Sequence, residues 1–338
     1  MSSTQVCVVG CGYWGKNLVR TFSSLGRLHG LYDAESDRLN SISKDYPKPK
    51  LFDDFEAVLN DPEITAVALA TPAESHYGLA MAALGANKHV FVEKPLALDW
   101  QDGAEMTAKA HERNRILMVG HLLQYHPAVV RLRELVAAGV LGRIEYIYSH
   151  RLSMGKIRRE ENALWSFAPH DISVILSLVG QSPCQVIATG GAYLQPNIAD
   201  VTMSNLLFDR GTRAHVFVSW LHPYKEQRLV IVGSKKMAVF EDTRPDRKLM
   251  LFDKRIEIRA GNLDAAKPEG VVVEFDSAEP LLLECRHFID CVERGTQPRT
   301  PGEEGVQVLR VLQACQLSLQ LNGEPVQDAH VSHKVMAL

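Results

Sequence analysis

The chain lacks any long hydrophobic run. Within its 338 residues no uninterrupted apolar stretch reaches the roughly 20 residues of a membrane-spanning helix, and the first five residues lack the charged and apolar regions of a signal peptide. An excess of positive charge is also missing, because 37 lysines and arginines are balanced by 40 aspartates and glutamates. We therefore expect a cytoplasmic protein with no membrane or nucleic-acid partner and with a small-molecule ligand.

Residue patterns typical of metal sites are missing as well. The six cysteines are scattered without a C-x-x-C pair, and none of the 13 histidines belongs to an H-x-x-x-H pattern. These spacings predict no metal site and favour reduced, buried thiols. No repeat or low-complexity tract interrupts the chain, so we expect ordinary globular domains, about two for this length.

The first 120 residues contain short apolar runs that alternate with segments of helical periodicity. The predicted strands are 6–9, 28–32, 66–70, 89–92 and 116–119, and the predicted helices are 16–23, 37–44, 74–84 and 101–112. Strands that alternate with helices indicate a parallel, doubly wound α/β sheet. We expect this first domain to span residues 1–120.

After residue 120 the pattern changes to longer strand-like stretches. The predicted strands are 144–152, 186–193, 201–208, 214–220 and 228–232, and the predicted helices are 126–138, 172–178, 281–292 and 304–321. Half-buried stretches of this kind are typical of antiparallel strands. We expect a second α/β domain over residues 121–338, whose closing helix, 304–321, packs back on the first domain.

A glycine-rich turn follows the first predicted strand. Gly10, Gly12 and Gly15 form a G-x-G-x-x-G pattern between a strand and a helix, with Tyr13 and Trp14 inside the loop. The first glycine permits a tight turn, the second lets a pyrophosphate approach the backbone, and the third lets the helix pack on the strand. The pattern predicts a dinucleotide whose pyrophosphate lies at the helix N-terminus.

A carboxylate ends the second predicted strand. Asp33 lies 18 residues beyond Gly15, close to the roughly 20 expected for a group that accepts hydrogen bonds from the adenosine ribose. Its negative charge would repel a 2′-phosphate, so NAD is favoured over NADP. The choice between NAD and NADP stays open for two reasons. Arg38 is nearby and could accommodate a 2′-phosphate, and Asp33 could instead cap a turn.

Two further motifs follow later strands. Thr71, Pro72 and His76 belong to the segment after strand 66–70, and Glu93 and Lys94 end strand 89–92 before a proline. Both segments should border the nicotinamide half of a crevice at the carboxyl ends of the strands. With the glycine pattern, they make the chain resemble the Gfo/Idh/MocA family of oxidoreductases. The resemblance covers essentially the whole chain and continues in L-G-R-I at 141–144, H-D-I-S at 170–173 and G-x-x-P-x-T at 295–300.

The resemblance implies a fold, a cofactor and a reaction. The expected fold is a Rossmann-type N-terminal domain with a C-terminal α/β domain whose large, open, mainly antiparallel sheet forms homodimers or homotetramers. The expected activity is hydride transfer to or from NAD, with Lys94 and His170 as catalytic residues. The cofactor-binding residues that it implies are Gly10, Gly12, Tyr13, Trp14, Gly15, Asp33, Thr71, Pro72, His76, Glu93, Lys94 and His121.

One position departs from the usual pattern of the family. An aspartate normally precedes the family histidine by four residues, and here Ser166 occupies that position. A carboxylate there would share a helix face with His170 and fix its tautomer, whereas Asp171 points about a quarter turn away. The departure predicts a less basic imidazole than in relatives.

Residues 156–173 and 219–227 resemble a subgroup of the family that acts on nucleotide-activated amino sugars. That resemblance implies oxidation of the 3-hydroxyl of a UDP-linked N-acetylamino sugar, most simply UDP-N-acetylglucosamine, ahead of an aminotransferase in lipopolysaccharide or lipid A biosynthesis. The uronate form of this sugar, a polyol or another keto sugar, and a non-catalytic NAD-binding sensor are the alternatives. The expected substrate-binding residues are Lys94, Tyr125, Lys156, Arg158, Arg159, Trp165, Ser166 and His170.

Several of these roles have a second interpretation. Lys156, Arg158 and Arg159 suit the phosphates of a UDP-sugar, but they also suit a solvated loop, because two glutamates follow directly. Trp165 and Tyr125 could stack on sugar or uracil, or could equally be core side chains. The sequence leaves these alternatives open.

Oxidation of a secondary alcohol needs a base for the hydroxyl proton and a donor for the developing oxygen charge. We expect His170 to be the base, since an ordinary imidazole suits proton transfer near neutral pH, and Lys94 to be the donor. A lysine in a closed crevice beside a nicotinamide cation could itself have a lowered pKa and act as the base. Both assignments remain open at this point.

Overall fold

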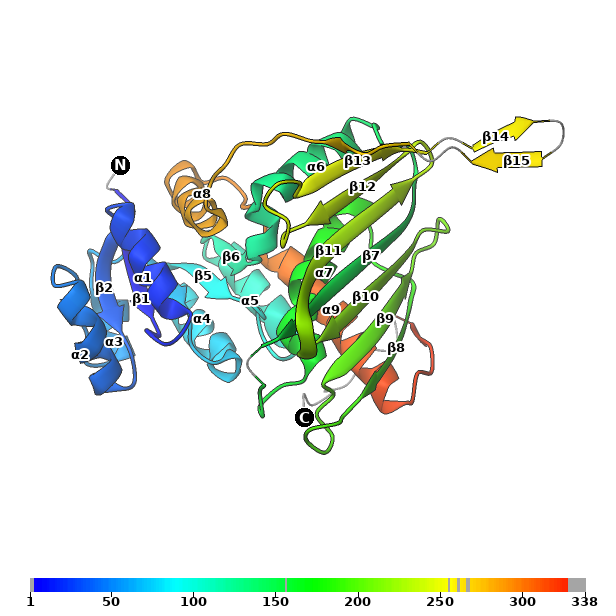
Figure 1. The fold of residues 1–338 in the computed structure, drawn as a ribbon. Helices are drawn as coiled ribbons and strands as arrows, with labels where there is room; N and C mark the ends of the chain where they lie inside the picture. Colours follow the sequence, from blue (N-terminus) through cyan, green and yellow to red (C-terminus); the bar gives the residue numbers. More distant parts are fainter. Residues whose placement is uncertain (1–2, 156, 255, 260–261, 266–267, 328–338) are drawn as a thin grey trace. The chain divides into compact units, whose positions relative to one another are not determined.

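The structure is a computed structural model that describes residues 3–155, 157–254, 256–259, 262–265 and 268–327 (Figure 1). Its chain divides into two compact units. Unit 1 contains residues up to 125 together with 278–309, and unit 2 contains residues 126–277 together with those from 310 onward. Each unit has its own sheet and is described by itself.

The sheet of unit 1 has six parallel strands in the order β3-β2-β1-β4-β5-β6. The chain runs outward in both directions from the pair β1 and β4, which makes the space beside their carboxyl ends the place where such sheets bind ligands. Both strands are buried along their whole length, as expected for a parallel sheet covered on two faces. The strands are β1 (Val6–Val9), β2 (Leu28–Tyr32), β3 (Lys50–Leu51), β4 (Ala66–Leu69), β5 (His89–Glu93) and β6 (Leu117–Gly120).

The helices of unit 1 connect these strands and cover the sheet. Asp54 and Asp99 cap two of them, accepting hydrogen bonds from the N–H groups of Ala57 (2.6 Å) and Gln101 (2.9 Å). The helices are α1 (Gly15–Ser24), α2 (Ser36–Asp45), α3 (Phe55–Asn60), α4 (His76–Gly85), α5 (Trp100–Glu112) and α8 (Pro280–Arg294), with short 3₁₀ turns η1 (Ala73–Ser75) and η2 (Leu122–Tyr125).

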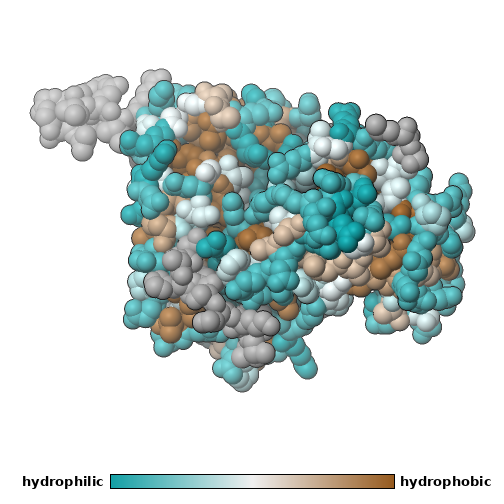
Figure 2. All heavy atoms as spheres, turned by 180° about the vertical axis from the view of Figure 1, so that it is seen from behind, coloured by the Kyte–Doolittle hydropathy of each residue, from teal (hydrophilic) through white to brown (hydrophobic). Residues whose placement is uncertain are grey.

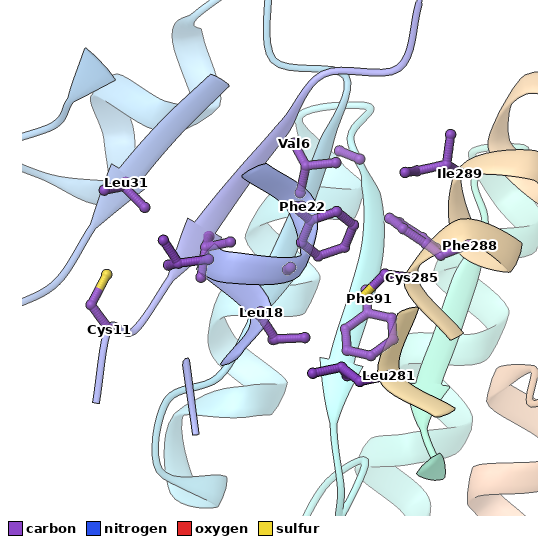
Figure 3. Packing of buried hydrophobic residues seen from close by; sticks show 14 of the residues in the cluster. Val6, Cys11, Leu18, Phe22, Leu31, Phe91, Leu281, Cys285, Phe288 and Ile289 are labelled. Carbon is purple, nitrogen blue, oxygen red and sulfur yellow. The ribbon is translucent and has the colours of Figure 1, made fainter. Parts of the chain in front are cut away.

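Helix α8 comes from the last quarter of the sequence but packs in the core of unit 1. Figure 3 shows Leu281, Cys285 and Phe288 of this helix directed toward β5 and α1. The rings of Phe288 and Phe91 meet edge to face with their centroids 5.7 Å apart. A helix that is far away in sequence therefore completes the hydrophobic core beneath β5.

The segment after α8 pairs with β6 at the edge of the same sheet. The carbonyl of Thr300 accepts from the N–H of Val119 (2.8 Å), and the Thr300 hydroxyl donates to the Val119 carbonyl (2.7 Å). These bonds satisfy backbone groups that an edge strand would otherwise expose.

The sheet of unit 2 has nine strands in the order β16-β13-β12-β11-β7-β10-β9-β8-β17. Every neighbouring pair is antiparallel except β7 with β10. The strands are β7 (Ile144–Met154), β8 (Gln185–Gly191), β9 (Val201–Leu207), β10 (Arg213–Ser219), β11 (Leu221–Gly233), β12 (Lys236–Glu241), β13 (Leu249–Asp253), β16 (Val271–Val272) and β17 (Val326–Gln327); β14 (Ile256–Arg259) and β15 (Asn262–Ala265) form a separate hairpin.

One face of this sheet packs on helix α7 (Ala163–Val179), which contacts β7, β9 and β10. Strands β9 and β10 alternate buried with exposed residues, so their other face is open. Helix α6 (Pro127–Ala137) lies against β12, and α9 (Gly302–Gln320) begins in unit 1 and ends in unit 2. The predicted fold class, a parallel Rossmann-like sheet followed by a mainly antiparallel one, is confirmed.

Two predicted elements begin earlier than the sequence indicated. The helix expected at 172–178 begins at Ala163, because the Asn162 side chain caps it there, and Pro169 lies inside the helix. The strand expected at 228–232 begins at Leu221, and its first part, which contains Pro223, pairs irregularly with β7. In both cases a proline inside the element, Pro169 or Pro223, led the sequence analysis to place the first residue too late.

Within the described part of the chain, no helix is both long enough and apolar enough to cross a bilayer. The face of the molecule in Figure 2 shows hydrophilic side chains interspersed with smaller hydrophobic patches. Scattered apolar groups of this kind are usual on protein surfaces.

Candidate active site

The glycine loop between β1 and α1 leaves its backbone open on one side. A Cβ on Gly10, whose φ is +91°, would lie 2.8 Å from the carbonyl of Ala70, and a Cβ on Gly15 would lie 1.9 Å from the carbonyl oxygen of Gly10. A Cβ on Gly12 would meet nothing within 4 Å. The first and third glycines are therefore required by packing, whereas the second keeps open the space that a pyrophosphate needs.

Asp33, at the end of β2, is held in place by three groups. Its carboxylate accepts from the N–H of Cys11 (2.7 Å) and the N–H of Glu35 (2.9 Å), and it pairs with the Arg38 guanidinium at 3.2 Å. The side chain of Arg38 is 38% exposed, whereas that of Asp33 is 3% exposed. A ribose hydroxyl can replace the exposed guanidinium of Arg38 while the two backbone bonds keep the carboxylate oriented. Asp33 thus caps its turn and is also placed for a ribose.

His76 links the two loops that follow β4 and β5. Its Nδ1 lies 2.8 Å from the Pro95 carbonyl and its Nε2 lies 3.0 Å from the Thr71 carbonyl. The ring is 1% exposed, and burial lowers the pKa of His76. The side chain therefore holds Thr71 and Lys94 in neighbouring loops, while Pro72 is exposed on the same edge.

Glu93 is a buried carboxyl group at the carboxyl end of β5. Its Oε1 accepts a hydrogen bond of 2.5 Å from the indole N–H of Trp14 in the glycine loop. Burial raises the pKa of Glu93 to about 7, although the hydrogen bond from Trp14 and the charge of the half-buried Lys94 both act to lower it. The bond between Trp14 and Glu93 ties the loop after β1 to the residue before Lys94.

His121 and Tyr125, which follow β6, are both 1% exposed. His121 Nδ1 lies 2.5 Å from the carboxylate of Glu304, at the start of α9. The Arg299 guanidinium lies 4.8 Å from the centre of the Tyr125 ring. Such contacts are those of a packed core side chain, and for Tyr125 they favour that interpretation over stacking on a substrate.

Taken together, unit 1 brings nearly all the expected cofactor-binding side chains to one edge. They follow the carboxyl ends of β1, β2, β4, β5 and β6, with Tyr13 almost fully exposed at 91%. Neighbouring parallel strands end at the same edge, so these residues lie along that edge, with His76, Glu93 and His121 buried.

In unit 2, helix α7 carries His170 half-buried and Ser166 buried one turn before it. The next residue, Asp171, accepts hydrogen bonds from Arg151 Nε (2.6 Å) and from the Ser149 hydroxyl (2.6 Å) of β7. Asp171 is 2% exposed and therefore anchors the helix to the sheet. Its carboxylate is therefore engaged by side chains of β7.

The side chains around α7 divide into exposed charges and buried anchors. Arg158 pairs with Glu161 at 3.0 Å, and Arg159 is exposed, whereas Lys156 lies outside the described residues. Trp165 is 1% exposed, and its indole N–H donates to Gln316 at 3.2 Å. This burial favours the core interpretation for Trp165.

One group of potential metal ligands comes together in the described residues. His29, Asp61 and Glu63 have ligand atoms within 4.8 Å of one another. Asp61 already pairs with the ammonium of Lys50 at 2.7 Å, and this ammonium neutralises the carboxylate in place of a metal ion. The arrangement is a surface ion-pair cluster, away from the carboxyl ends of the strands.

Comparison with protein-family models identifies both halves of the chain. Residues 4–121 match the model of the Gfo/Idh/MocA oxidoreductase family with an NAD-binding Rossmann fold, and residues 129–239 match the model of its C-terminal domain. Together the two matches cover more than half of the chain. The chain belongs to the Gfo/Idh/MocA oxidoreductase family.

Curated members of this family with similar sequences have different substrates. UDP-N-acetylglucosamine 3-dehydrogenase from Acidithiobacillus ferrooxidans is 28% identical over 238 residues, which are 70% of this chain and 71% of that protein. NAD⁺-dependent scyllo-inositol 2-dehydrogenase from Bacillus subtilis is 25% identical over 340 residues, or 96% of each chain. These similarities support an NAD-dependent dehydrogenase and leave the substrate to be argued separately.

A solved structure of UDP-N-acetylglucosamine 3-dehydrogenase GnnA from Acidithiobacillus ferrooxidans has the same fold. The TM-score is 0.83 at 24% identity, and the match covers 95% of this chain and 99% of that one. Membership of the family and the fold together establish NAD as the cofactor of the Rossmann unit.

The side chains of unit 1 fit this cofactor. The open space beside Gly12 suits the pyrophosphate, and the Asp33 carboxylate suits the adenosine ribose. Thr71 and Lys94 lie in neighbouring loops, where the nicotinamide half of the dinucleotide would be held. The fit rests on the side chains of unit 1 alone.

Three partners of the expected site residues escaped the sequence analysis. Glu304 contacts His121, Gln316 contacts Trp165, and Arg151 contacts Asp171. The first two pairs are separated by 183 and 151 residues, and no local spacing signals such contacts. A covarying pair in related sequences is the signal that could have found them.

Proposed function

We propose that this member of the family oxidises the 3-hydroxyl of UDP-N-acetylglucosamine with NAD⁺. The proposal is carried by the similarity to UDP-N-acetylglucosamine 3-dehydrogenase over 70% of the chain. The edge of unit 1 that carries the glycine loop, Asp33 and Lys94 supports the NAD-dependent part of the reaction. The product would be the 3-keto sugar, which an aminotransferase can consume.

The bound NAD⁺ supplies the hydride acceptor. Lys94 follows the buried end of β5, and we assign it the role of donating a hydrogen bond to the C3 oxygen as negative charge develops there. His170, on α7, takes the hydroxyl proton as general base. Asp171 is a positioning residue in this scheme, because its bonds to β7 hold the helix turn that carries His170.

Arg158 and Arg159 are the groups that we assign to the two phosphates of the UDP-sugar. Arg158 is paired with Glu161 at 3.0 Å, and its side chain is 35% exposed, so a phosphate competes with a carboxylate that is already in place. Guanidinium groups form two parallel hydrogen bonds with phosphate oxygens, which favours the exchange.

The test of the function is an assay of NAD⁺ reduction with a panel of substrates, coupled to an aminotransferase that removes the ketone. The panel contains UDP-N-acetylglucosamine, UDP-N-acetylglucosaminuronate, UDP-glucose and scyllo-inositol. We expect the highest kcat/KM with UDP-N-acetylglucosamine. A preference for the uronate would move the assignment to the neighbouring activity, and turnover of scyllo-inositol alone would overturn it.

Variants of the two proposed catalytic residues complete this assay. Lys94→Ala and His170→Ala should each lower kcat by about 10² to 10⁴, the usual loss when a general acid or base is removed. NADH binding by His170→Ala should stay unchanged, because this residue lies in unit 2 and the cofactor surface lies in unit 1. Turnover close to wild type in both variants would contradict the assignment.

The pH dependence of kcat distinguishes the two possible bases. A histidine base should lose activity in acid through one group in the range of an ordinary imidazole, near pH 6.5. His170→Ala should abolish that limb of the profile. If the limb persists in His170→Ala, His170 is not the base, and the double variant His170→Ala with Glu93→Gln then separates Lys94 from the Glu93 carboxyl group, whose pKa is about 7.

A second candidate is the oxidation of a free polyol. The similarity to scyllo-inositol 2-dehydrogenase, at 25% identity, extends over 96% of both chains. A polyol carries no phosphate, so this candidate predicts that Arg158→Gln with Arg159→Gln leaves KM unchanged. The UDP-sugar proposal predicts that the same double variant raises KM.

We further propose that the chain forms homodimers or homotetramers through the open face of the nine-stranded sheet. Tyr148 and His215 stack on this face with their ring centres 5.3 Å apart, and Tyr146 and Met203 are 45% and 51% exposed. Exposed rings and thioethers on a broad sheet are typical of the central part of a protein interface.

A further inference from the structure

Unit 1 contains a cavity at the amino ends of β5 and β6, at the opposite end of these strands from Lys94. Its volume is about 590 Å³. The lining comes from the first residues of the two strands, the last turns of α5 with the following turn, and the segment 295–303, which all belong to unit 1. We call it the N-edge pocket. Its volume lies in the range of sites that hold a small metabolite.

His89 contributes a hydrogen-bond donor to the N-edge pocket. The N–H of Ile116 donates to Nδ1 of His89 at 3.0 Å, so Nδ1 carries the lone pair and Nε2 carries the proton of the neutral ring. Burial, and then the charge of Arg115, lower the pKa of His89 to about 4. The ring is therefore neutral near pH 7, and its free position is a donor.

Arg115 adds further donors next to this ring. Its Nη1 lies 3.4 Å from Nε2 of His89, so that two donors face each other with no acceptor between them. The Nε of Arg115 is buried and has no hydrogen-bond partner among the residues that the structure describes. An oxygen placed in the pocket beside Nε2 of His89 and Nη1 of Arg115 would accept from both and remove this opposition of donors.

The acidic group in the lining is already engaged. Glu303 lies 2.7 Å from His111 in an ion-pair geometry. Of the remaining polar side chains in the lining, Thr107 donates its hydroxyl to the Gly103 carbonyl at 2.8 Å. Asn114 and Gln297 are exposed amides that can donate or accept. The pocket therefore offers unsatisfied donors on His89 and Arg115 and no unengaged carboxylate in its described lining.

We propose that the N-edge pocket is a second ligand site that binds a small anionic metabolite through its carboxylate or phosphoryl oxygens. The oxygens accept from Nε2 of His89 and from the guanidinium of Arg115, which stops the two donors from opposing each other. The cofactor loop lies at the carboxyl end of the strands, so the anion binds while NAD is bound.

Isothermal titration of the full-length protein, saturated with NADH and UDP, tests the proposal. The probes are inorganic phosphate and citrate, with potassium chloride at the same ionic strength as the reference. NADH covers the glycine loop, and UDP competes for any other phosphate site. We expect saturable binding of at least one probe, and a preference between the two identifies a phosphoryl or a carboxylate ligand.

Variants assign the binding to the N-edge pocket. Arg115→Gln should weaken binding by at least about tenfold, since it removes a charge-assisted pair of donors. Gln297→Trp, at an exposed lining position, should block the cavity without entering the core. Arg113→Gln is the matched control, because it removes the same charge from the same turn outside the lining, and it should bind as the wild type does.

Three results would overturn the proposal. One is no saturable binding of either probe by the wild-type protein. Another is equal affinity in the wild type and Gln297→Trp, which reports on the cavity even if Arg115→Gln fails to fold. The last is an equal loss in Arg113→Gln and Arg115→Gln, which would indicate a diffuse effect of surface charge.

Discussion

At the scale of single residues, Glu93 is the side chain whose charge state matters most. It is buried between Trp14 and Lys94, and burial raises its pKa to about 7. A group of this kind is protonated below neutral pH and ionised above it. Its charge therefore responds to any new charge at the carboxyl end of β5, where we propose that the nicotinamide binds.

We predict that the affinity for NAD⁺ depends on pH through Glu93. The cationic nicotinamide favours the ionised carboxylate, so the Kd for NAD⁺ should fall by about tenfold as the pH rises from about 6 to about 8. NADH carries no charge on this ring and is the control ligand, whose Kd should change much less. Fluorescence titration of both forms checks this, and a Glu93→Gln variant that retains the full pH dependence would contradict it.

Glu284, on α8, is a second buried carboxyl group and has no role in the proposed chemistry. It is 0% exposed, and neither carboxyl oxygen has a hydrogen-bond partner among the described residues. Burial, and then the charge of Glu93, hold the pKa of Glu284 well above its usual range. The folded protein keeps this group protonated, whereas the unfolded chain releases the proton near pH 4.3.

We predict that Glu284 destabilises the fold as the pH rises. The raised pKa of Glu284 contributes to the free energy of unfolding. This contribution is fully present below the pKa of Glu284 in the unfolded chain, and it is lost progressively as the pH rises toward the pKa in the folded protein. Glu284→Gln should therefore raise the free energy of unfolding relative to the wild type by more at about pH 8 than at about pH 5. The two increments should differ by on the order of 1 kcal/mol or more. Urea unfolding at both values measures it, and Glu56→Gln, at an exposed helix position, is the matched control.

Residue-scale predictability depended on whether the signal was local. The glycine pattern and the position of Asp33 were visible because a strand, a turn and a helix follow one another directly in sequence. The pairing of Trp14 with Glu93 spans 79 residues and depends on strand order, which no spacing reveals. Burial favours the core interpretation for Tyr125 and Trp165, and burial is a property of the folded chain.

At the scale of secondary structure, α7 is the element on which the proposed mechanism depends. It is attached to β7 by the pair of Asp171 and Arg151, with side chains 2% and 16% exposed. Removal of one partner from a buried ion pair strongly destabilises the fold, because the other charge then stays buried without a partner.

We predict that Asp171→Asn lowers the free energy of unfolding by about 3 to 5 kcal/mol. The double variant Asp171→Leu with Arg151→Met should recover much of the stability, since it leaves no unpaired charge, but it should not recover activity if α7 shifts. Denaturant unfolding and kcat measured together check both parts. Arg131→Gln breaks an exposed pair with Glu134 and should cost less than about 1 kcal/mol.

Elements with strong periodicity were predicted, and short or interrupted ones were missed. The strands and helices that carry the glycine loop and Lys94 appear in the structure near their expected bounds. Helix α3 and the two-residue strands β3, β16 and β17 were missed, because so few residues cannot display a period. Strands β12 and β13 follow β11 as a meander whose pairing only the sheet reveals.

At the scale of the whole molecule, the open face of the nine-stranded sheet remains to be covered. We predict a dimer or tetramer in solution. The double variant Met203→Glu with Tyr146→Glu should weaken the association, because burying two carboxylates in the interface on the open face of the sheet costs free energy. Light scattering after size-exclusion chromatography measures the mass. Leu51→Glu, a similar change at a 40% exposed position in unit 1, should leave the mass unchanged. A wild-type monomer would contradict the proposal.

The central claim is that the hydrogen on C3 of the sugar moves to NAD⁺. Its most direct test is turnover of UDP-N-acetylglucosamine deuterated at C3, followed by mass spectrometry of the reduced cofactor. The account predicts one deuterium per reduced nicotinamide and a primary isotope effect on kcat/KM in the wild type, and Lys94→Ala should transfer the same deuterium at a rate lower by about 10² to 10⁴. Reduced cofactor without deuterium, or no reduction with this sugar while a polyol is oxidised, would contradict it.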